Sequence, residues 1–444
     1  MSRVIFMLAL AGAVWTTTSL ADDRYFSTTG SDDAHCKGGT RSHPWRSLEA
    51  QSRHGCIHGG QTLILMPGNY DANSDFFFGK KGRINISGKD GRPVTLRSDI
   101  GNRQHQRAVF RGAFVVNGSN IIFSDIEFTG DTSGQPVLAV GGGRNVRIEK
   151  STIRGPAGSW INGLARRGDC IKVVADIKPM SGVEIEGNSI HDCAEDAIDV
   201  NGAHHVLIRG NVISRSSQIQ IKGGAKNITI SENHLHHMTK GILGQGMDCS
   251  ADLGRYCGSY DLLEIHPSNR FQAMDVLISN NRIQDLSDGV AIEASGWHRA
   301  TIIDNRFENI GSYPQPLIRV RRNIGTAYTD DAAQAFCRST PSRCQPCSKT
   351  LKNGCKRVLS QSRDVRVVNN TVVNAHARAR FFYIEKDSSE NAPCLNENRF
   401  AGPALVDVAF EGKISTYRNG SDTCVSSQAG APSTPSNVHV EPTE

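Results

Sequence analysis

Three carboxylates lie within one short stretch of the sequence, EDAIDVNG at residues 195–202. The stretch alternates apolar and polar residues as a β-strand does, and like charges side by side on a pleated surface are destabilising. Glu195, Asp196 and Asp199 therefore either bind a cation or point into water without a role. We take cation binding as the hypothesis, because neighbouring stretches supply chemistry that a bound cation would use.

The stretches one repeat before and one repeat after EDAIDVNG carry further charged residues. RRGDCIKVV places Asp169 at the head of a strand, and SQIQIKGG carries Lys222 directly before two glycines. Side chains alternate between the faces of a strand, so the inward direction of Ile198 leaves Asp199 facing outwards. The same rule directs Lys222 outwards. We expect one solvent-facing patch formed by Asp169, Glu195, Asp196, Asp199 and Lys222.

Such a patch has the composition of a calcium site beside a base. Calcium prefers carboxylate oxygens, and four carboxylates converging on a rigid sheet match that preference. A cation disfavours the charged ammonium of a neighbouring lysine, so a neutral amine becomes available. The cation also neutralises a substrate carboxylate and makes the C5 proton of a uronate easier to remove. The residues predict a Ca²⁺-dependent β-elimination with Lys222 as the base and Asp169, Glu195, Asp196 and Asp199 as the metal ligands.

A short repeated pattern must position these residues. It aligns NVRIEKSTI from residue 145, GVEIEGNSI from residue 182 and NITISENHL from residue 227, among others. Most repeats start roughly two dozen residues apart, a period typical of coiled repeat folds. Stacked asparagine amides can hydrogen-bond from turn to turn, because each both donates and accepts. The shared asparagines are Asn188, Asn211, Asn233, Asn281, Asn305 and Asn370.

The repeats predict an all-β chain in which about Pro93 to Val373 form one continuous parallel coil. The two longest steps between repeats bear on this coil. The step from Asn227 to Asp275 allows either two turns or one turn with an insertion, whereas the step from Arg299 to Asp364 requires an insertion.

The two ends of the chain differ from the repeats. Residues 1–21 combine a basic residue, an apolar run and a small-residue pattern, which predicts a signal peptide and a secreted or periplasmic protein. Residues 22–425 are expected to form a single domain, in which 22–92 make an N-terminal cap and the first coils, with a short helix from Ser47. The Pro/Ser-rich residues 426–444 are predicted to be a disordered tail.

All twelve cysteines follow the predicted cleavage point. An even number of cysteines in an oxidising compartment favours disulfides. Residues 311–360 form a predicted Cys-rich insertion, where the C-x2-C spacing of Cys344 and Cys347 is interpreted as part of a disulfide-stapled loop rather than a zinc site. The predicted local pairs are Cys36–Cys56, Cys170–Cys193 and Cys249–Cys257.

Over roughly residues 25–400 the chain resembles the right-handed parallel β-helix of the pectate-lyase-like superfamily. Its site motifs are similar to those of family 9 polysaccharide lyases, whose characterised members include calcium-dependent pectate lyases. In that family an aspartate in an Asp-Gly-containing strand and an Asp-Asp-Gly-x-Asp strand one coil later form the calcium site. A lysine before a glycine pair on a later coil is the base.

The family's residues carry over with departures. The first element matches Asp169, the second matches Glu195, Asp196 and Asp199, and the third matches Lys222. Glutamate replaces the first aspartate of the second element, and Ala197 replaces its glycine. Lys222 lies directly against the glycines, where the family usually has one residue between. These departures affect the lysine assignment more than the ligand assignment.

Other residues compete for these roles or accompany them. Two lysines are rivals for the base, and two arginines before Asp169 either bind a substrate carboxylate or offset local negative charge. A histidine run at a turn is more typical of a structural or solvated position than of a catalytic one, and an acidic residue and a histidine two coils further along would extend a substrate groove. The lysines are Lys172 and Lys240, the arginines are Arg166 and Arg167, the histidine run is His234, His236 and His237, and the last two residues are Glu293 and His298.

Three alternative functions remain open. A uronate C5-epimerase would use the same cation and base but needs a second proton donor. A hydrolase would need paired acids, and no Asp-Asp pair with a following Gly-His-Gly strand is present. A non-catalytic glycan-binding scaffold would keep the coils without using the carboxylates. The net charge of +6 suits an acidic polysaccharide partner, and a monomer without nucleic-acid or membrane partners is expected.

Overall fold

The structure is a computed structural model, and it describes residues 22–33, 35–72, 82–100, 106–156, 168–174, 180–244, 272–310, 316–321, 323–328, 355–360, 362–373, 380–385, 394–401, 405–410 and 413–418. The predicted signal peptide, the predicted tail, the Cys249–Cys257 pair, Cys344 and Cys347 lie outside these residues.

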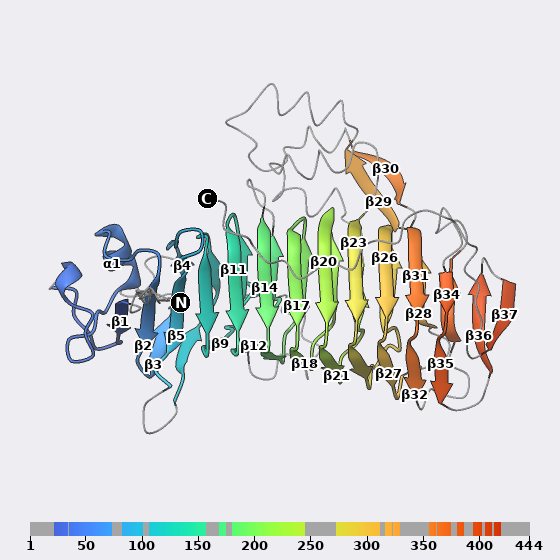
Figure 1. The fold of residues 1–444 in the computed structure, drawn as a ribbon, viewed down its shortest axis with the longest axis horizontal. Coiled ribbons are helices and arrows are strands. Elements are labelled where there is room, and N and C mark those ends of the chain that lie inside the picture. Colours follow the sequence, from blue (N-terminus) through green and yellow to red (C-terminus); the bar gives the residue numbers. More distant parts are fainter. Residues whose placement is uncertain are drawn as a thin grey trace, which may run out of the picture.

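Successive turns of the chain each add one strand to three long sheets, which run side by side along the long axis of Figure 1. We call them sheets A, B and C. Sheet A consists of β1 (Asp22–Phe26), β2 (Gln61–Leu65), β5 (Val94–Ser98), β8 (Ile121–Ser124), β11 (Arg144–Glu149), β14 (Ser181–Glu186), β17 (His204–Arg209), β20 (Ala225–Ser231), β23 (Ala273–Ser279), β26 (Trp297–Ile303), β31 (Arg363–Val368) and β34 (Cys394–Asn396).

Sheet B consists of β3 (Gly68–Asp71), β6 (Ala108–Arg111), β9 (Glu127–Thr129), β12 (Thr152–Arg154), β15 (Ser189–His191), β18 (Val212–Ser214), β21 (His234–His236), β24 (Arg282–Gln284), β27 (Arg306–Glu308), β32 (Thr371–Val373) and β35 (Arg399–Ala401).

Sheet C carries Asp199 and Lys222. It consists of β4 (Arg83–Ile84), β7 (Phe114–Val116), β10 (Leu138–Gly141), β13 (Ile171–Val174), β16 (Ile198–Asn201), β19 (Ile219–Lys222), β22 (Ile242–Leu243), β25 (Ile292–Ser295), β28 (Pro316–Arg321), β33 (Arg380–Ile384), β36 (Leu405–Phe410) and β37 (Lys413–Arg418). Its strands pair in parallel except at the C-terminal end, where β36 and β37 are antiparallel.

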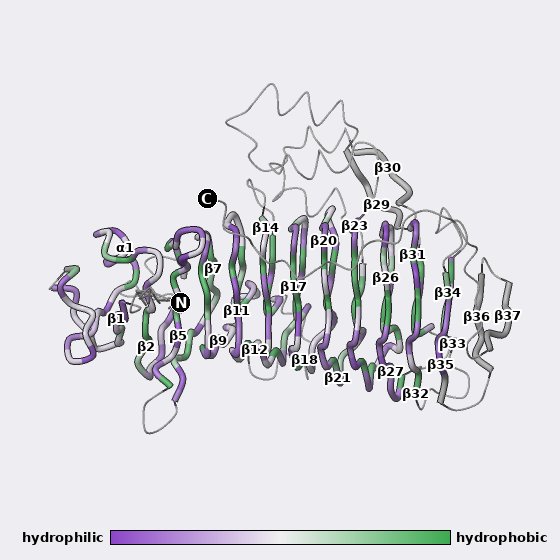
Figure 2. Tube along the Cα trace, viewed as in Figure 1, coloured by the Kyte–Doolittle hydropathy of each residue, from purple (hydrophilic) through white to green (hydrophobic). Residues whose placement is uncertain are grey.

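The coil encloses a continuous apolar core. Alternate residues of each strand point inwards, so that Val206 and Ile208 of β17 are almost completely buried while Leu207 between them is only partly buried. Figure 2 shows hydrophobic and hydrophilic residues alternating along the coils. The same alternation, read from the sequence, predicted the coil, and the predicted stacking of the repeats from residues 182, 205 and 227 is confirmed because β14 pairs with β17 and β17 with β20.

A ladder of buried asparagines fixes one turn of the coils from Asn188 onwards. Asn188 Nδ2 donates to Asn211 Oδ1 at 3.0 Å, and the same contact is repeated along the stack as far as Asn398. The residue before each asparagine has a left-handed backbone conformation, as at Gly187 with φ 61° and Glu232 with φ 59°. Asn233 Nδ2 donates directly to Asn281 Oδ1 at 2.9 Å, so the longer step between these two repeats is one turn with an insertion.

The coils extend beyond the predicted limits of Pro93 and Val373, because β2 precedes them and β33, β34 and β35 follow. The range 311–360 contains β28, which is a coil strand of sheet C, so the segment outside the coils begins after it. In that segment β29 (Asn323–Tyr328) and β30 (Cys355–Ser360) pair as an antiparallel hairpin.

The N-terminal end carries the expected short helix, α1 (Leu48–Arg53). The side chain of its N-cap residue, Ser47, accepts a hydrogen bond from Ala50 N at 3.0 Å, as N-cap serines commonly do. A short 3₁₀ helix, η1 (His35–Lys37), precedes it. Among the described residues, no helix is long and apolar enough to cross a membrane.

Two of the predicted disulfides are confirmed. Cys36 is bonded to Cys56 with a Cα–Cα distance of 5.0 Å, and Cys170 is bonded to Cys193 with a Cα–Cα distance of 5.3 Å. The second bond joins two neighbouring coils immediately beside Asp169, so it ties the loop before β13 to the loop before β16.

Candidate functional site

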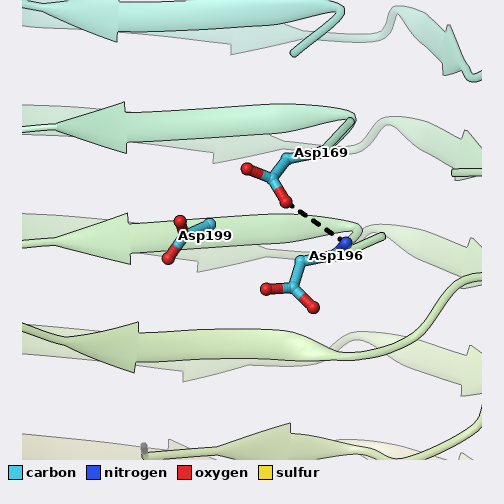
Figure 3. Close-up of side chains that lie close together, drawn as sticks. All are labelled: Asp169, Asp196 and Asp199. Carbon is cyan, nitrogen blue, oxygen red and sulfur yellow. Dashed lines mark hydrogen bonds between the residues drawn. The ribbon is translucent and has the colours of Figure 1, made fainter. Parts of the chain in front are cut away.

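Parallel pairing of β13 and β16 in sheet C brings together Asp169 and Asp196, which lie just before the N-terminal ends of these strands. Each lies two residues before a strand, Asp169 before β13 and Asp196 before β16. Cys170 N donates to Asp196 O at 2.9 Å, which fixes the two segments in register. Asp196 N also donates to Asp169 Oδ1 at 3.3 Å, as Figure 3 shows. The position of these two carboxylates is therefore set by backbone pairing.

Asp199 completes a cluster of three carboxylates. It is the second residue of β16, and an oxygen from each of Asp169, Asp196 and Asp199 lies within 4.8 Å of the others. Figure 3 shows the three side chains converging from two adjacent coils. Convergence of oxygen atoms at this spacing is what a hard divalent cation requires.

The cluster is much less exposed than the expected solvent-facing patch, so that part of the prediction is wrong. Asp169, Asp196 and Asp199 are 4%, 3% and 1% exposed. Their side chains leave the core as alternation requires, but strands of neighbouring coils lie about 4.8 Å apart, so side chains in register cover one another. Gln220, the register partner of Asp199 on β19, is itself buried.

Glu195 lies outside this cluster. Its side chain is exposed, whereas the three aspartates are buried. Its charge still acts on the site, because it contributes to raising the pKa of Asp169 and of Asp196. Its role as a metal ligand stays a prediction.

Lys222 lies beside the cluster, at the last position of β19. Its Nζ is 3.5 Å from Asp199 Oδ1 and donates to Gln220 Oε1 at 2.8 Å. Its side chain is 12% exposed. The next two residues, Gly223 and Gly224, have φ of 71° and 83°, a backbone conformation that suits glycine. The sharp turn after Lys222 therefore depends on the glycine pair noted in the sequence.

The two rival lysines have different positions. Lys172, on β13, is the register partner of Asp199, and its Nζ donates to Asp199 Oδ2 at 2.6 Å and to Asp169 Oδ2 at 3.0 Å. Lys240 instead pairs with Asp288 at 3.4 Å. Within the described ranges, the site thus contains two lysines, Lys172 and Lys222.

The electrostatics of the cluster show an excess of negative charge. Burial, followed by repulsion from Asp199, raises the pKa of Asp169 to about 6. Burial, followed by repulsion from Asp169, holds the pKa of Asp196 well above its ordinary value. Two ammonium groups therefore do not fully compensate three buried carboxylates.

Two oxygen atoms of the cluster also lack hydrogen bonds. Asp196 Oδ1 and Asp199 Oδ1 are buried and accept no hydrogen bond from the residues that the structure describes. Buried carboxylate oxygens without donors are costly unless a cation or a solvent molecule compensates them. The donor set, its spacing and these two atoms all fit a calcium ion held by Asp169, Asp196 and Asp199.

Sequence reasoning gave no role to Asn201, which lies two positions beyond Asp199 and opposite Lys222. It is 1% exposed, and neither polar atom of its amide forms a hydrogen bond within the described part of the chain. The signal in the sequence that could have identified Asn201 was its outward position in the alternation of β16. A buried amide without hydrogen-bond partners is unusual. It adds a second polar side chain, on the neighbouring strand, beside Lys222.

The remaining predicted residues that the structure describes do not join the cluster. Glu293 lies on sheet C three coils beyond Asp199, and it accepts hydrogen bonds from Arg319 Nε and Ser295 Oγ, both at 2.9 Å. His298 lies on β26 of sheet A, so it does not extend the outer row of sheet C. The histidines of ENHLHHM lie on or next to β21 of sheet B. Arg166 and Arg167 are outside the described residues.

Comparisons with known proteins agree with this architecture. Residues 174–314 match the family model described as "Right handed beta helix region". The solved structures similar to this chain include an alginate lyase from Paenibacillus sp. str. FPU-7, with 12% identity, a TM-score of 0.45, and coverage of 82% of this chain and 95% of that chain. A search of the curated proteins found no significant match.

Two further solved structures are among those similar to this chain. The A-module of the mannuronan C-5 epimerase AlgE6 from Azotobacter vinelandii has 13% identity and a TM-score of 0.45, with coverage of 82% and 92%. The pectate lyase Pel9A has 13% identity and a TM-score of 0.32, with coverage of 88% and 79%. The family match and the three parallel sheets confirm the predicted right-handed parallel β-helix, the fold of the pectate-lyase-like superfamily.

Proposed function

We propose that the protein is an exported, calcium-dependent polysaccharide lyase that cleaves a uronate-containing polysaccharide by β-elimination. The observation that carries the proposal is the amine of Lys222, 3.5 Å from the carboxylate of Asp199 at the edge of a buried cluster of three aspartates. The cluster offers oxygen ligands to a divalent cation, and the amine offers a base next to them.

Asp169, Asp196 and Asp199 would hold the ion, with Glu195 as a further candidate ligand. When bound, the ion supplies positive charge that offsets a substrate carboxylate and the negative charge that develops beside it. The chain's own contribution is rigidity. Backbone pairing of β13, β16 and β19 fixes the ligand positions before any substrate binds, and the Cys170–Cys193 disulfide holds the first two of these coils together.

Lys222 would remove the C5 proton of the uronate. Gln220 Oε1 accepts a hydrogen bond from Lys222 Nζ and so orients it, and Asp199 Oδ1 lies 3.5 Å from the same nitrogen. In β-elimination the proton passes to the amine, the C5–H electron pair forms a C4–C5 double bond, and the C4–O bond breaks. The leaving oxygen keeps the electron pair of that bond and takes a proton from water. The products are an unsaturated uronate end and a shortened chain with a free hydroxyl group.

Sequence features support the cellular setting of this activity. The predicted signal peptide and two disulfides suit a secreted or periplasmic protein. The resemblance of the motifs around Asp169, Asp196 and Lys222 to those of family 9 polysaccharide lyases supports an acidic polysaccharide as substrate. We expect the protein to act as a monomer.

The test is a screen of acidic polysaccharides, with calcium and with a chelator, that follows ultraviolet absorbance from unsaturated uronate ends. Pectate, alginate, glycosaminoglycans and bacterial exopolysaccharides form the panel. Calcium-dependent absorbance on one polymer is the expected result. A calcium-dependent change in uronate configuration without absorbance would instead assign an epimerase. Binding without either change, or no effect on any polymer, would favour a non-catalytic scaffold.

A further inference from the structure

Lys172 occupies a position where a metal ion and an ammonium group would compete. It lies on β13, in register with Asp199 on β16. Its Nζ donates to one oxygen of Asp199 at 2.6 Å and to one oxygen of Asp169 at 3.0 Å. These two carboxylates belong to the group of three whose oxygens converge within 4.8 Å. The ammonium of Lys172 thus bridges two of the three candidate metal ligands.

The contacts of Lys172 differ in kind from those of Lys222. Lys222 is 3.5 Å from the other oxygen of Asp199 and makes its hydrogen bond to Gln220. Lys172 makes two short hydrogen bonds to charged groups, which are the stronger type. Its side chain is 18% exposed, so the ammonium has a route outwards if its place is taken.

We propose that Lys172 is a resident counter-cation of the aspartate cluster, and that calcium binds only by displacing its ammonium from Asp169 and Asp199. The inference rests on the proposed function in one respect, because it takes the cluster to be a metal site. It gives Lys172 a role apart from that of the base. In the metal-free protein Lys172 neutralises the buried carboxylates, and in the metal-bound protein the ion does so.

Charge balance makes the consequence of removing Lys172 specific. The three aspartates face two lysines, and Asp196 Oδ1 and Asp199 Oδ1 remain without hydrogen-bond donors among the described residues. A neutral residue in place of Lys172 leaves the carboxylates with one ammonium group. The metal-free fold then loses stability, because buried like charges repel. Calcium affinity rises, because no ammonium must be displaced first.

The experiment compares three variants by calorimetric titration with CaCl₂ after the metal has been stripped. Lys172→Met keeps the length and apolar stem of the side chain without its charge, and Lys172→Arg keeps the charge. Lys226→Met is the matched control for loss of a lysine outside the cluster, because Lys226 lies on β20 of sheet A rather than on sheet C. Circular dichroism and the melting temperature of each metal-free variant establish that it is folded.

The expected result is calcium binding at least about tenfold to a hundredfold tighter in Lys172→Met than in wild type, because that range corresponds to one hydrogen bond to a charged group and Lys172 makes two. Lys172→Arg and Lys226→Met bind as wild type does or more weakly. Metal-free Lys172→Met melts at a lower temperature than wild type, and calcium raises its melting temperature more.

Two outcomes would overturn the inference, and they differ in what else they refute. Equal calcium affinity in wild type and a folded Lys172→Met, or weaker binding in that variant, shows that the lysine does not compete, and the metal site of the proposed function survives. Absence of calcium binding in both proteins refutes the metal site itself and the inference with it.

Discussion

Replacing Asp169 with asparagine should stabilise the metal-free protein while weakening its metal site. Asparagine keeps an oxygen that can accept from Asp196 N and removes one of three buried charges. The pKa of Asp169 is raised from 3.8 to about 6, mainly by burial and then by repulsion from Asp199. At 1.36 kcal/mol per pKa unit, a rise of about 2 units corresponds to about 3 kcal/mol. We expect a gain of about 1 to 3 kcal/mol at pH 7.5, since part of the contact with Lys172 is lost.

The sign of the pH dependence follows from the same shift. Below the unfolded pKa of 3.8, Asp169 is protonated in both states and costs nothing. As the pH rises towards about 6, the unfolded chain loses this proton before the folded protein does, so the contribution of Asp169 to the stability of wild type becomes increasingly unfavourable across that window. The Asp169→Asn variant lacks this contribution. Its advantage over wild type should therefore be small at pH 4 and reach its full size at pH 7.5.

The assay is urea unfolding in the presence of a chelator at both pH values, followed by titration with calcium. Asp90→Asn is the control, because Asp90 is a largely exposed carboxylate paired with Arg144 at the surface. Such pairs contribute about 1 kcal/mol or less, so this control should stay close to wild type at both pH values. A metal-free Asp169→Asn protein that is less stable than wild type at pH 7.5, or equally shifted at both pH values, would refute the reasoning.

Two further predictions concern the scaffold. Asn233→Ala should lower the free energy of unfolding by about 3 to 6 kcal/mol, because buried donors and acceptors on Asn211, Ile208 and Asn281 lose their partner. The control Asn117→Ala, at an exposed position, should change that free energy by about 0.5 kcal/mol or less. Equal effects of the two substitutions in urea unfolding would contradict a stabilising role of the asparagine ladder. Replacing both Cys170 and Cys193 with serine should lower the free energy of unfolding by about 3 kcal/mol. It should also weaken calcium binding, because the disulfide lies beside Asp169. An unchanged melting temperature and calcium affinity would show that the disulfide supports neither the fold nor the metal site.

The coil itself could be predicted from the sequence because its determinants are local and repeated. Alternation identified the strands, and the asparagines from Asn188 to Asn370 marked the same turn in each repeat. What repetition could not supply was the length of each insertion. The step from Asn227 to Asp275 was ambiguous until the hydrogen bond between Asn233 and Asn281 showed one turn.

The convergence of the three aspartates could be predicted from the sequence, but not their burial, the position of Glu195 outside the cluster or the cation balance. Spacing of one coil brought Asp169, Asp196 and Asp199 together, because parallel strands in register keep that order. Exposure depends on side chains from neighbouring coils, which alternation within one strand does not describe. The same limit applies to Lys172, since its contact with Asp199 follows from register between strands.

The central claim is that Lys222 removes a proton from a uronate next to a bound cation. Arginine in its place keeps the positive charge and much of the stem but cannot supply a neutral amine near neutral pH. On the polymer that wild type cleaves, Lys222→Arg should form unsaturated ends at least about 100-fold more slowly, the lower range for loss of a general base. Calcium binding should persist, because the three aspartates are unchanged. Wild-type rates in Lys222→Arg would contradict the account and move the base to another residue.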